Sequence, residues 1–139
     1  MKIIIGSDHA GFCIKQQIKN SLIEQGYEIE DIGCENNNRC DYPIIAQKLC
    51  QKINDTTRGI LICGTGIGMG IQANRYKHIR CGVCHDIYAA EMTRKHNNAN
   101  VIALGARITN EINAINIVEV FLKTEFEDGR HQNRINQII

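Results

Sequence analysis

The sequence has no tryptophan, one proline and only 5% aromatic residues. Sites that stack nucleic-acid bases combine aromatic and basic side chains, and this chain does not interleave the two. Its net charge of +1 also creates no field that would attract a nucleic acid or an anionic membrane. We therefore expect neither nucleic acid nor membrane among its partners.

Long apolar runs are also missing. The amino terminus, MKIIIGSDH, becomes polar after three isoleucines, which is too short for the core of a signal peptide, and no run reaches membrane-spanning length. The sequence therefore predicts a cytoplasmic protein. Seven cysteines are an odd number in a chain without an export signal, so we expect reduced thiols. Of these, we expect Cys13, Cys50 and Cys84 to be buried and inert.

One cysteine pattern requires separate consideration. Cys81, Cys84 and His85 match the CxxCH form of covalent haem attachment, and CxxC alone could be half of a zinc site. Haem attachment requires export, and no second CxxC or HxxxH pair offers the missing ligands. We expect no metal and no cofactor here, and we interpret RCGVC as a short apolar strand.

The densest run of glycine lies mid-chain, in GILICGTGIGMGIQANR at 59–75. The apolar residues 60–62 predict a strand buried on both faces of a parallel sheet. The glycines after Cys63 permit a sharp turn with uncovered N–H groups, and a helix starting there would point its positive end at a ligand. The spacing differs from the dinucleotide-binding fingerprint. An ordinary strand-to-helix turn with a buried cysteine would look the same in sequence.

Strand and helix patterns alternate along the chain. We expect strands near 2–6, 27–32, 60–63, 80–84 and 101–104, and helices near 12–25, 41–53, 86–96, 110–123 and 129–138. A further helix should begin inside the glycine loop after Cys63 and end near residue 75. This alternation predicts one domain over 1–139, an α/β fold with three α/β/α layers. Its five-stranded parallel sheet would be Rossmann-like, with the flavodoxin-like order 2-1-3-4-5 and an extra C-terminal helix. Asp8, His9 and the loop 63–68 should then meet in a crevice where the chain reverses direction across the sheet.

Five blocks of the sequence occur in the order found in type B ribose-5-phosphate isomerases, which the chain resembles over nearly its full length. They are GSDHAG at 6–11, DYP at 41–43, CGTGIG at 63–68, RKHNNANVIALGARI at 94–108 and GRHQNR at 129–134. The family also includes galactose-6-phosphate isomerase subunits and allose-6-phosphate isomerases. The resemblance implies interconversion of ribose 5-phosphate and ribulose 5-phosphate through ring opening and an enediolate, without metal or organic cofactor.

The resemblance also implies roles for individual residues. Cys63 would move a proton between C2 and C1, Thr65 would assist proton exchange between O1 and O2, and His96 would be the acid that opens the furanose. Some relatives lack this cysteine and use a glutamate six residues later, where this chain has Met69, so Cys63 would act alone. The resemblance implies that the arginines bind the phosphate. The full set of implied substrate contacts is Asp8, His9, Gly64, Gly66, Ile67, Gly68, Asn97, Arg107, Arg130 and Arg134.

Several alternatives remain open at this point. The ring-opening base could be Asp8, His9 or Thr65. The substrate could be allose 6-phosphate or galactose 6-phosphate, although the galactose branch departs from the HN and GRHQ blocks present here. A non-catalytic sugar-phosphate sensor would need no thiol base. An electron carrier or response regulator would need phosphate-loop or acidic residues that the chain lacks.

The route of the chain also predicts assembly. The helix at 86–96 leads away from the active edge of the sheet, and a helix of about ten residues spans about 15 Å, so His96 should lie at the edge opposite Cys63. We therefore expect a homodimer with shared active sites, which could pair further into a tetramer. A second copy would bring His96, Arg130 and Arg134 to the site.

Overall fold

Strands and helices alternate along the computed structural model, which describes all 139 residues. The strands are β1 (Lys2–Ser7), β2 (Glu28–Asp31), β3 (Thr57–Cys63), β4 (Cys81–Val83) and β5 (Val101–Gly105). The helices are α1 (Phe12–Glu24), α2 (Tyr42–Cys50), α3 (Ile67–Ala73), α4 (Ile87–Lys95), α5 (Glu111–Lys123) and α6 (Arg130–Ile135). The predicted alternation is confirmed, with α2 and α6 each ending about one turn earlier than expected.

One parallel sheet contains all five strands, in the order β2-β1-β3-β5-β4. The predicted order 2-1-3-4-5 is therefore wrong in its last two strands. Burial explains the difference, because every residue of β5 is buried, as a strand with neighbours on both sides requires, whereas no residue of β4 is fully buried. β5 takes the interior position beside β3, and the short β4 forms the edge.

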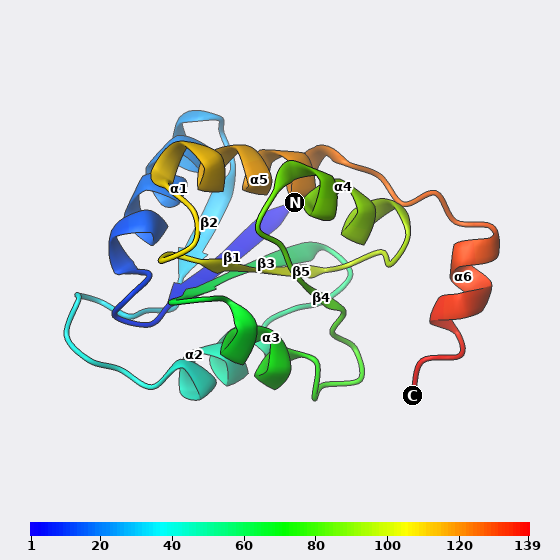
Figure 1. Cartoon of the computed structure of the whole chain (residues 1–139), viewed down its shortest axis with the longest axis horizontal. Helices are drawn as coiled ribbons and strands as arrows, with labels where there is room; N and C mark the ends of the chain where they lie inside the picture. Colours follow the sequence, from blue (N-terminus) through cyan, green and yellow to red (C-terminus); the bar gives the residue numbers. More distant parts are fainter.

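Helices cover both faces of the sheet and complete the three predicted layers (Figure 1). On one face, α1, α4 and α5 bury an apolar stripe that includes Ile18, Ala90 and Phe121. On the other face, α2 and α3 contribute Leu49 and Met69 to a second core. α6 stands apart from the sandwich at the C-terminal end (Figure 1). None of the helices combines the length and the apolar composition that crossing a bilayer requires.

The cysteines do not all remain free. Cys34 and Cys40 form a disulfide, so the expectation of seven reduced thiols is wrong for this pair. The backbone explains why the two residues meet, because both ends of the loop between them are tied to the end of β1. The Cys34 N–H donates to the Ser7 carbonyl at 2.7 Å, and the Cys40 N–H donates to Nδ1 of His9 at 3.3 Å.

The remaining cysteines differ in exposure. Cys13 is exposed on α1, so the expectation that it is buried is wrong; it lies on the outward side of the helix. Cys50 and Cys84 are buried, as predicted, and desolvation raises the pKa of Cys50 to about 11 and that of Cys84 to about 12. Burial likewise raises the pKa of Cys81. These thiols are held in the inert, protonated form.

Candidate active site

The carboxyl ends of β1 and β3 lie side by side at one edge of the sheet. The register pairs Ser7 with Ile62, so Asp8 and Cys63 follow at the same level. The Asp8 N–H continues this pairing by donating to the Ile62 carbonyl at 3.1 Å. The two loops that the sequence analysis singled out therefore meet where the chain reverses direction across the sheet, as predicted.

Cys63 ends β3 with 5% of its surface exposed, and its Sγ accepts a hydrogen bond from the N–H of Gly66 at 3.1 Å. Gly66 can present this amide because its φ is 81°, in the left-handed region that favours glycine. A Cβ at Gly66 would lie 2.9 Å from the carbonyl carbon of Leu104. The loop thus holds a backbone donor against the sulfur in a conformation that other residues rarely adopt.

The residues on either side of Gly66 separate into exposed and buried positions. Thr65 is exposed, and its Oγ1 accepts the N–H of Ile67 at 3.3 Å, which leaves the hydroxyl hydrogen free to donate elsewhere. Ile67 is 52% exposed, whereas Met69 is fully buried in the core beside α2. Met69 belongs to the same buried cluster as Cys63, and its thioether has no proton to exchange there.

Two larger side chains lie over the glycines of this loop. A Cβ at Gly64 would lie 3.0 Å from Nη1 of Arg107, and one at Gly68 would lie 2.6 Å from the ring of Tyr42. The Arg107 N–H donates to the Gly64 carbonyl at 2.9 Å, which fixes the backbone of both loops. Arg107 forms no ion pair in the chain, so its charge remains available to an anion.

Asp8 and His9 lie at the end of β1, on the side of the candidate site that faces the 63–68 loop. Asp8 is 7% exposed, and its Oδ1 accepts the N–H groups of Ala10 at 3.0 Å and Gly11 at 3.2 Å. Since Nδ1 of His9 accepts the Cys40 N–H, Nε2 carries the hydrogen in the neutral ring.

A pocket of about 420 Å³ opens beside Asp8 and His9. Its lining residues are Asp8, His9, Arg39, Cys40, Asp41, Tyr42, Pro43 and Ile44. Larger hollows of about 790 and 620 Å³ lie around β2 among lysines and glutamates and contain none of the predicted site residues. The smaller pocket is the one that adjoins the predicted site.

Four predicted site residues lie elsewhere. His96 is the C-cap of α4, Asn97 follows it, and Arg130 and Arg134 are exposed on α6. β5 is level with Cys63 at its carboxyl end, where Gly105 pairs with Cys63, whereas Val101 at its amino end pairs with Gly59. His96 precedes this amino end in the chain. Four steps along a strand cover about 13 Å, so one chain does not join the two groups.

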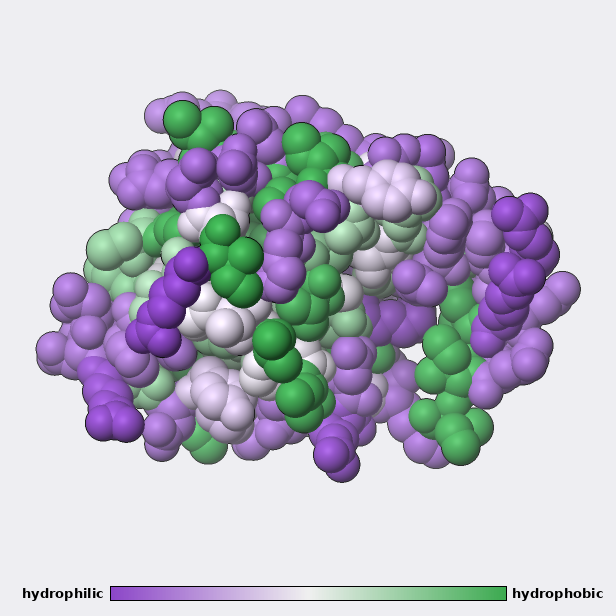
Figure 2. All heavy atoms as spheres, in the orientation of Figure 1, coloured by the Kyte–Doolittle hydropathy of each residue, from purple (hydrophilic) through white to green (hydrophobic).

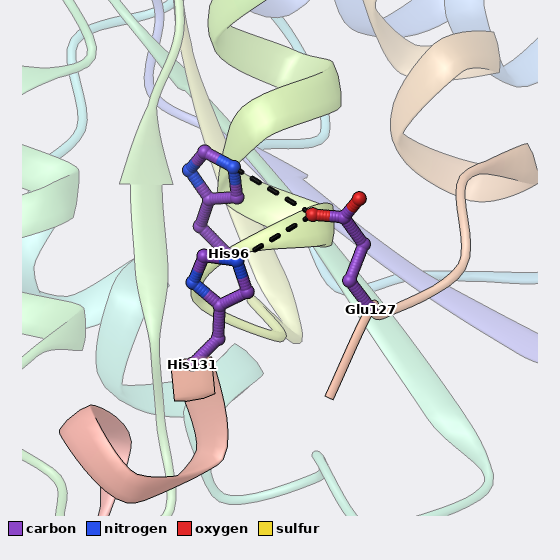
Figure 3. A group of neighbouring side chains, drawn as sticks. All are labelled: His96, Glu127 and His131. Carbon is purple, nitrogen blue, oxygen red and sulfur yellow. Dashed lines mark ion pairs between the residues drawn. The ribbon is translucent and has the colours of Figure 1, made fainter. Parts of the chain in front are cut away.

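Two residues that the sequence analysis did not single out surround His96 (Figure 3). The ring of His131 stacks on that of His96, with centroids 4.4 Å apart and 15° between the planes. Oε1 of Glu127 lies 3.8 Å from Nε2 of His96 and 3.5 Å from Nε2 of His131. His131 lies within the GRHQNR block, but nothing in the sequence indicates Glu127, because the chain turns at Asp128 through a φ of 63° that no periodicity predicts.

The model of a family described as Ribose/Galactose Isomerase matches residues 3–138. This chain belongs to the ribose/galactose isomerase family. The chain is 41% identical to ribose-5-phosphate isomerase B of Escherichia coli, with 99% of this chain and 93% of that protein covered.

Solved structures in this isomerase family agree with the fold. Ribose-5-phosphate isomerase B of Clostridium thermocellum superposes with a TM-score of 0.95 at 44% identity, covering 99% of this chain and 94% of that one. Ribose-5-phosphate isomerase B of Mycoplasma genitalium, solved with bound ribulose-5-phosphate, gives a TM-score of 0.91 at 38% identity, covering 99% of this chain and 93% of that one. The isomerase family and its fold therefore extend over the whole chain.

Proposed function

We propose that this chain interconverts ribose 5-phosphate and ribulose 5-phosphate through an enediolate. The relatives named for this reaction support the substrate. The observation that carries the chemistry is the Cys63 sulfur held against the Gly66 amide, one strand away from Asp8. A thiolate there would take the proton from C2 of the open-chain aldose and return it to C1, which converts aldose to ketose.

Each remaining step has a candidate group. The negative oxygen of the enediolate would be stabilised by the amides of the 64–68 loop, because backbone N–H donors stabilise oxyanions without reorganising. The free hydroxyl hydrogen of Thr65 could assist proton exchange between O1 and O2. Arg107, which lies against Gly64, would bind the phosphate beside this loop. Asp8 and His9 are placed to contact the sugar hydroxyls and ring.

Ring opening requires a second copy of the chain, because His96 lies at the far end of β5 from Cys63. We infer a homodimer in which each site takes His96, Asn97 and the α6 arginines from the other copy. Exposed apolar side chains support this assembly, and Figure 2 shows apolar atoms gathered at the centre of one face. The exposed large apolar residues within or just before α3, α4 and α5 are Ile67, Ile71, Ile87, Tyr88, Ile108 and Ile112. A closed twofold interface would cover such a surface and form two equal sites.

Exchange of the C2 proton of ribose 5-phosphate with deuterated solvent tests the reaction itself. We expect the parent chain to exchange this proton and Cys63→Ala to lose exchange by at least about 100-fold, since general base catalysis contributes on that scale. Cys13→Ala, which removes an exposed thiol outside the site, is the matched control and should behave like the parent. Binding without exchange in the parent would indicate a sensor. Faster turnover of allose 6-phosphate would identify a hexose phosphate isomerase.

Mixed chains test the shared site. Cys63→Ala and His96→Asn each inactivate every site of a pure dimer, but a mixed dimer would contain one site with both parent residues. We expect activity to return on mixing, to at most about a quarter of the parental value when chains exchange at random and in equal amounts. Mixed dimers that form but remain inactive would show that the two residues do not share a site.

A further inference from the structure

His96, Glu127 and His131 form a compact unit whose last two members have no part in the proposed reaction (Figure 3). His96 comes from the end of α4, His131 from α6, and Glu127 from the segment before α6. The Glu127 N–H donates to the Lys95 carbonyl at 3.1 Å, so the backbone anchors this carboxylate beside His96. His131 is buried, with its side chain 8% exposed, whereas the His96 side chain is 41% exposed.

Two histidines and a carboxylate could suggest a metal site, because their ligand atoms lie within 4.8 Å of one another. The geometry of the rings opposes this interpretation. A metal bound to imidazole lies close to the plane of the ring, along the nitrogen lone pair. Two stacked rings, 4.4 Å apart and 15° from parallel, cannot both hold one ion in their planes. The arrangement instead suits a carboxylate that faces two N–H groups.

The charges around the unit differ for the two histidines. Burial lowers the pKa of His131, the positive charges of His96, Arg130 and Arg134 lower it further, and Glu127 only partly opposes them. His131 therefore stays neutral near pH 7. Of the charged groups that face the unit, Lys95, Arg130 and Arg134 are positive and Glu127 is negative. Glu127 is thus the counter-charge for a proton on the more exposed ring, His96.

We infer that Glu127 and His131 are positioning residues for the ring-opening step, in which Glu127 balances the protonated His96 ring and the stacked His131 ring fixes its plane. The inference rests on the proposed function, in which His96 supplies the proton. That proton passes to the ring oxygen of the furanose as the bond between C1 and this oxygen breaks and its electrons go to the oxygen. The C1 hydroxyl loses its proton to a base on the other side, which leaves the open-chain aldehyde.

The ketose separates this step from the rest of the reaction. Ribulose 5-phosphate cannot close to a furanose, because its C5 oxygen carries the phosphate, so its C1 proton can exchange with solvent without ring opening. We would measure turnover of ribose 5-phosphate, which is mostly cyclic, against pH, and exchange of the C1 proton of ribulose 5-phosphate in deuterated solvent. Loss of a residue that acts only through His96 lowers turnover of ribose 5-phosphate but leaves exchange on ribulose 5-phosphate unchanged. Unchanged exchange also shows that the variant is folded and assembled.

Glu127→Gln should reduce turnover of ribose 5-phosphate roughly fivefold, the scale of a partly exposed ion pair. It should also move the loss of turnover at high pH to lower pH, because a neutral amide favours the protonated ring less. Exchange on ribulose 5-phosphate should stay at the parental rate. Glu125→Gln removes the same charge from the exposed residue two positions away and is the matched control, with no expected change.

His131→Ala should reduce turnover of ribose 5-phosphate by about tenfold, whereas His131→Phe, which keeps an aromatic stack, should restore most of it. If Glu127→Gln keeps the parental pH profile, or if exchange on ribulose 5-phosphate falls in step with turnover, the inference is overturned while the isomerase function stands. A Phe variant as slow as the Ala variant would overturn the stacking role. Absence of exchange in the parent chain would overturn the proposed function and, with it, the inference.

Discussion

An alanine at Gly66 would place a methyl group against the backbone of a central strand. Its Cβ would lie 2.9 Å from the carbonyl carbon, 3.1 Å from the carbonyl oxygen and 3.2 Å from the nitrogen of Leu104. These atoms belong to β5, which is paired on both sides and has little freedom to move. The left-handed conformation costs an L-residue about 1–2 kcal/mol, and forced overpacking adds about 1–3 kcal/mol. We expect Gly66→Ala to lower the free energy of unfolding by roughly 2–5 kcal/mol.

Gly26→Ala separates the two contributions. Gly26 ends α1 with a φ of 90°, so its backbone also lies in the left-handed region, but a Cβ there would meet no atom within 4 Å. Only the conformational cost of about 1–2 kcal/mol should lower the free energy of unfolding, and activity should not change. Urea denaturation of both variants gives the two free energies. Equal destabilisation would show that the contact with Leu104 has no cost.

Activity should fall for a separate reason. If the 63–68 loop shifts to relieve the contact, the Gly66 N–H loses its 3.1 Å hydrogen bond to the Cys63 sulfur. A hydrogen bond to a charged partner is worth about 1.5–3 kcal/mol, which corresponds to roughly 10- to 150-fold in rate. The assay is exchange of the C2 proton of ribose 5-phosphate. Parental exchange in a destabilised Gly66→Ala variant would refute the claim that this amide supports the sulfur during proton transfer.

Three further predictions concern stability and the thiols. Lys15→Ala should lower the free energy of unfolding by about 3–5 kcal/mol, because the fully buried ammonium pairs with Asp31 at 2.9 Å. Lys19→Ala removes a half-buried partner of the same carboxylate at 3.2 Å and should lower it by less than about 1 kcal/mol. Urea denaturation of the two variants measures this difference. Burial alone would raise the pKa of Asp31, but the Gly33 N–H and Lys15 hold it below its ordinary value. Its contribution to stability should therefore be complete above about pH 4 and disappear as the pH falls through the lower folded value, so acid unfolding of Asp31→Asn should depend less on pH. A thiol reagent in denaturant should find five reactive cysteines per chain without reductant and seven after reduction; seven without reductant would contradict the disulfide.

The fold was predictable because its signals are local. Apolar runs and glycine turns locate the strands, and the polar alternation of 27–32 identifies the edge strand β2. The order of β4 and β5 was predicted wrongly because local sequence patterns do not determine which strands pair with each other. The lengths of the two runs differ in the sequence, because VIALGA covers six residues before Arg107, whereas CGVC covers four between Arg80 and His85.

Only one part of the candidate site was predictable from the sequence. Asp8, His9 and the 63–68 loop follow strands directly, so their meeting follows from the topology of a parallel sheet. The surroundings of His96 depend instead on how an irregular segment folds back after α5. Glu127 is a carboxylate without a motif, and its backbone is placed by the bond from its N–H to the Lys95 carbonyl, which the sequence does not reveal. The Cys34–Cys40 disulfide was missed for the same reason, because tertiary tethers bring the loop ends together.

Correcting the strand order does not weaken the argument for a second copy. With β5 beside β3, His96 is one strand closer to Cys63 across the sheet than the order 2-1-3-4-5 would place it. The separation along the strands is unchanged, because it is determined by β5, whose register aligns Gly105 with Cys63 and leaves His96 before Val101. No order of parallel strands would remove that distance, since a helix that leads from one strand to the next must return to the amino edge. The proposal that two chains share the site therefore rests on parallel topology and on the position of His96 in the sequence, whichever strand order holds.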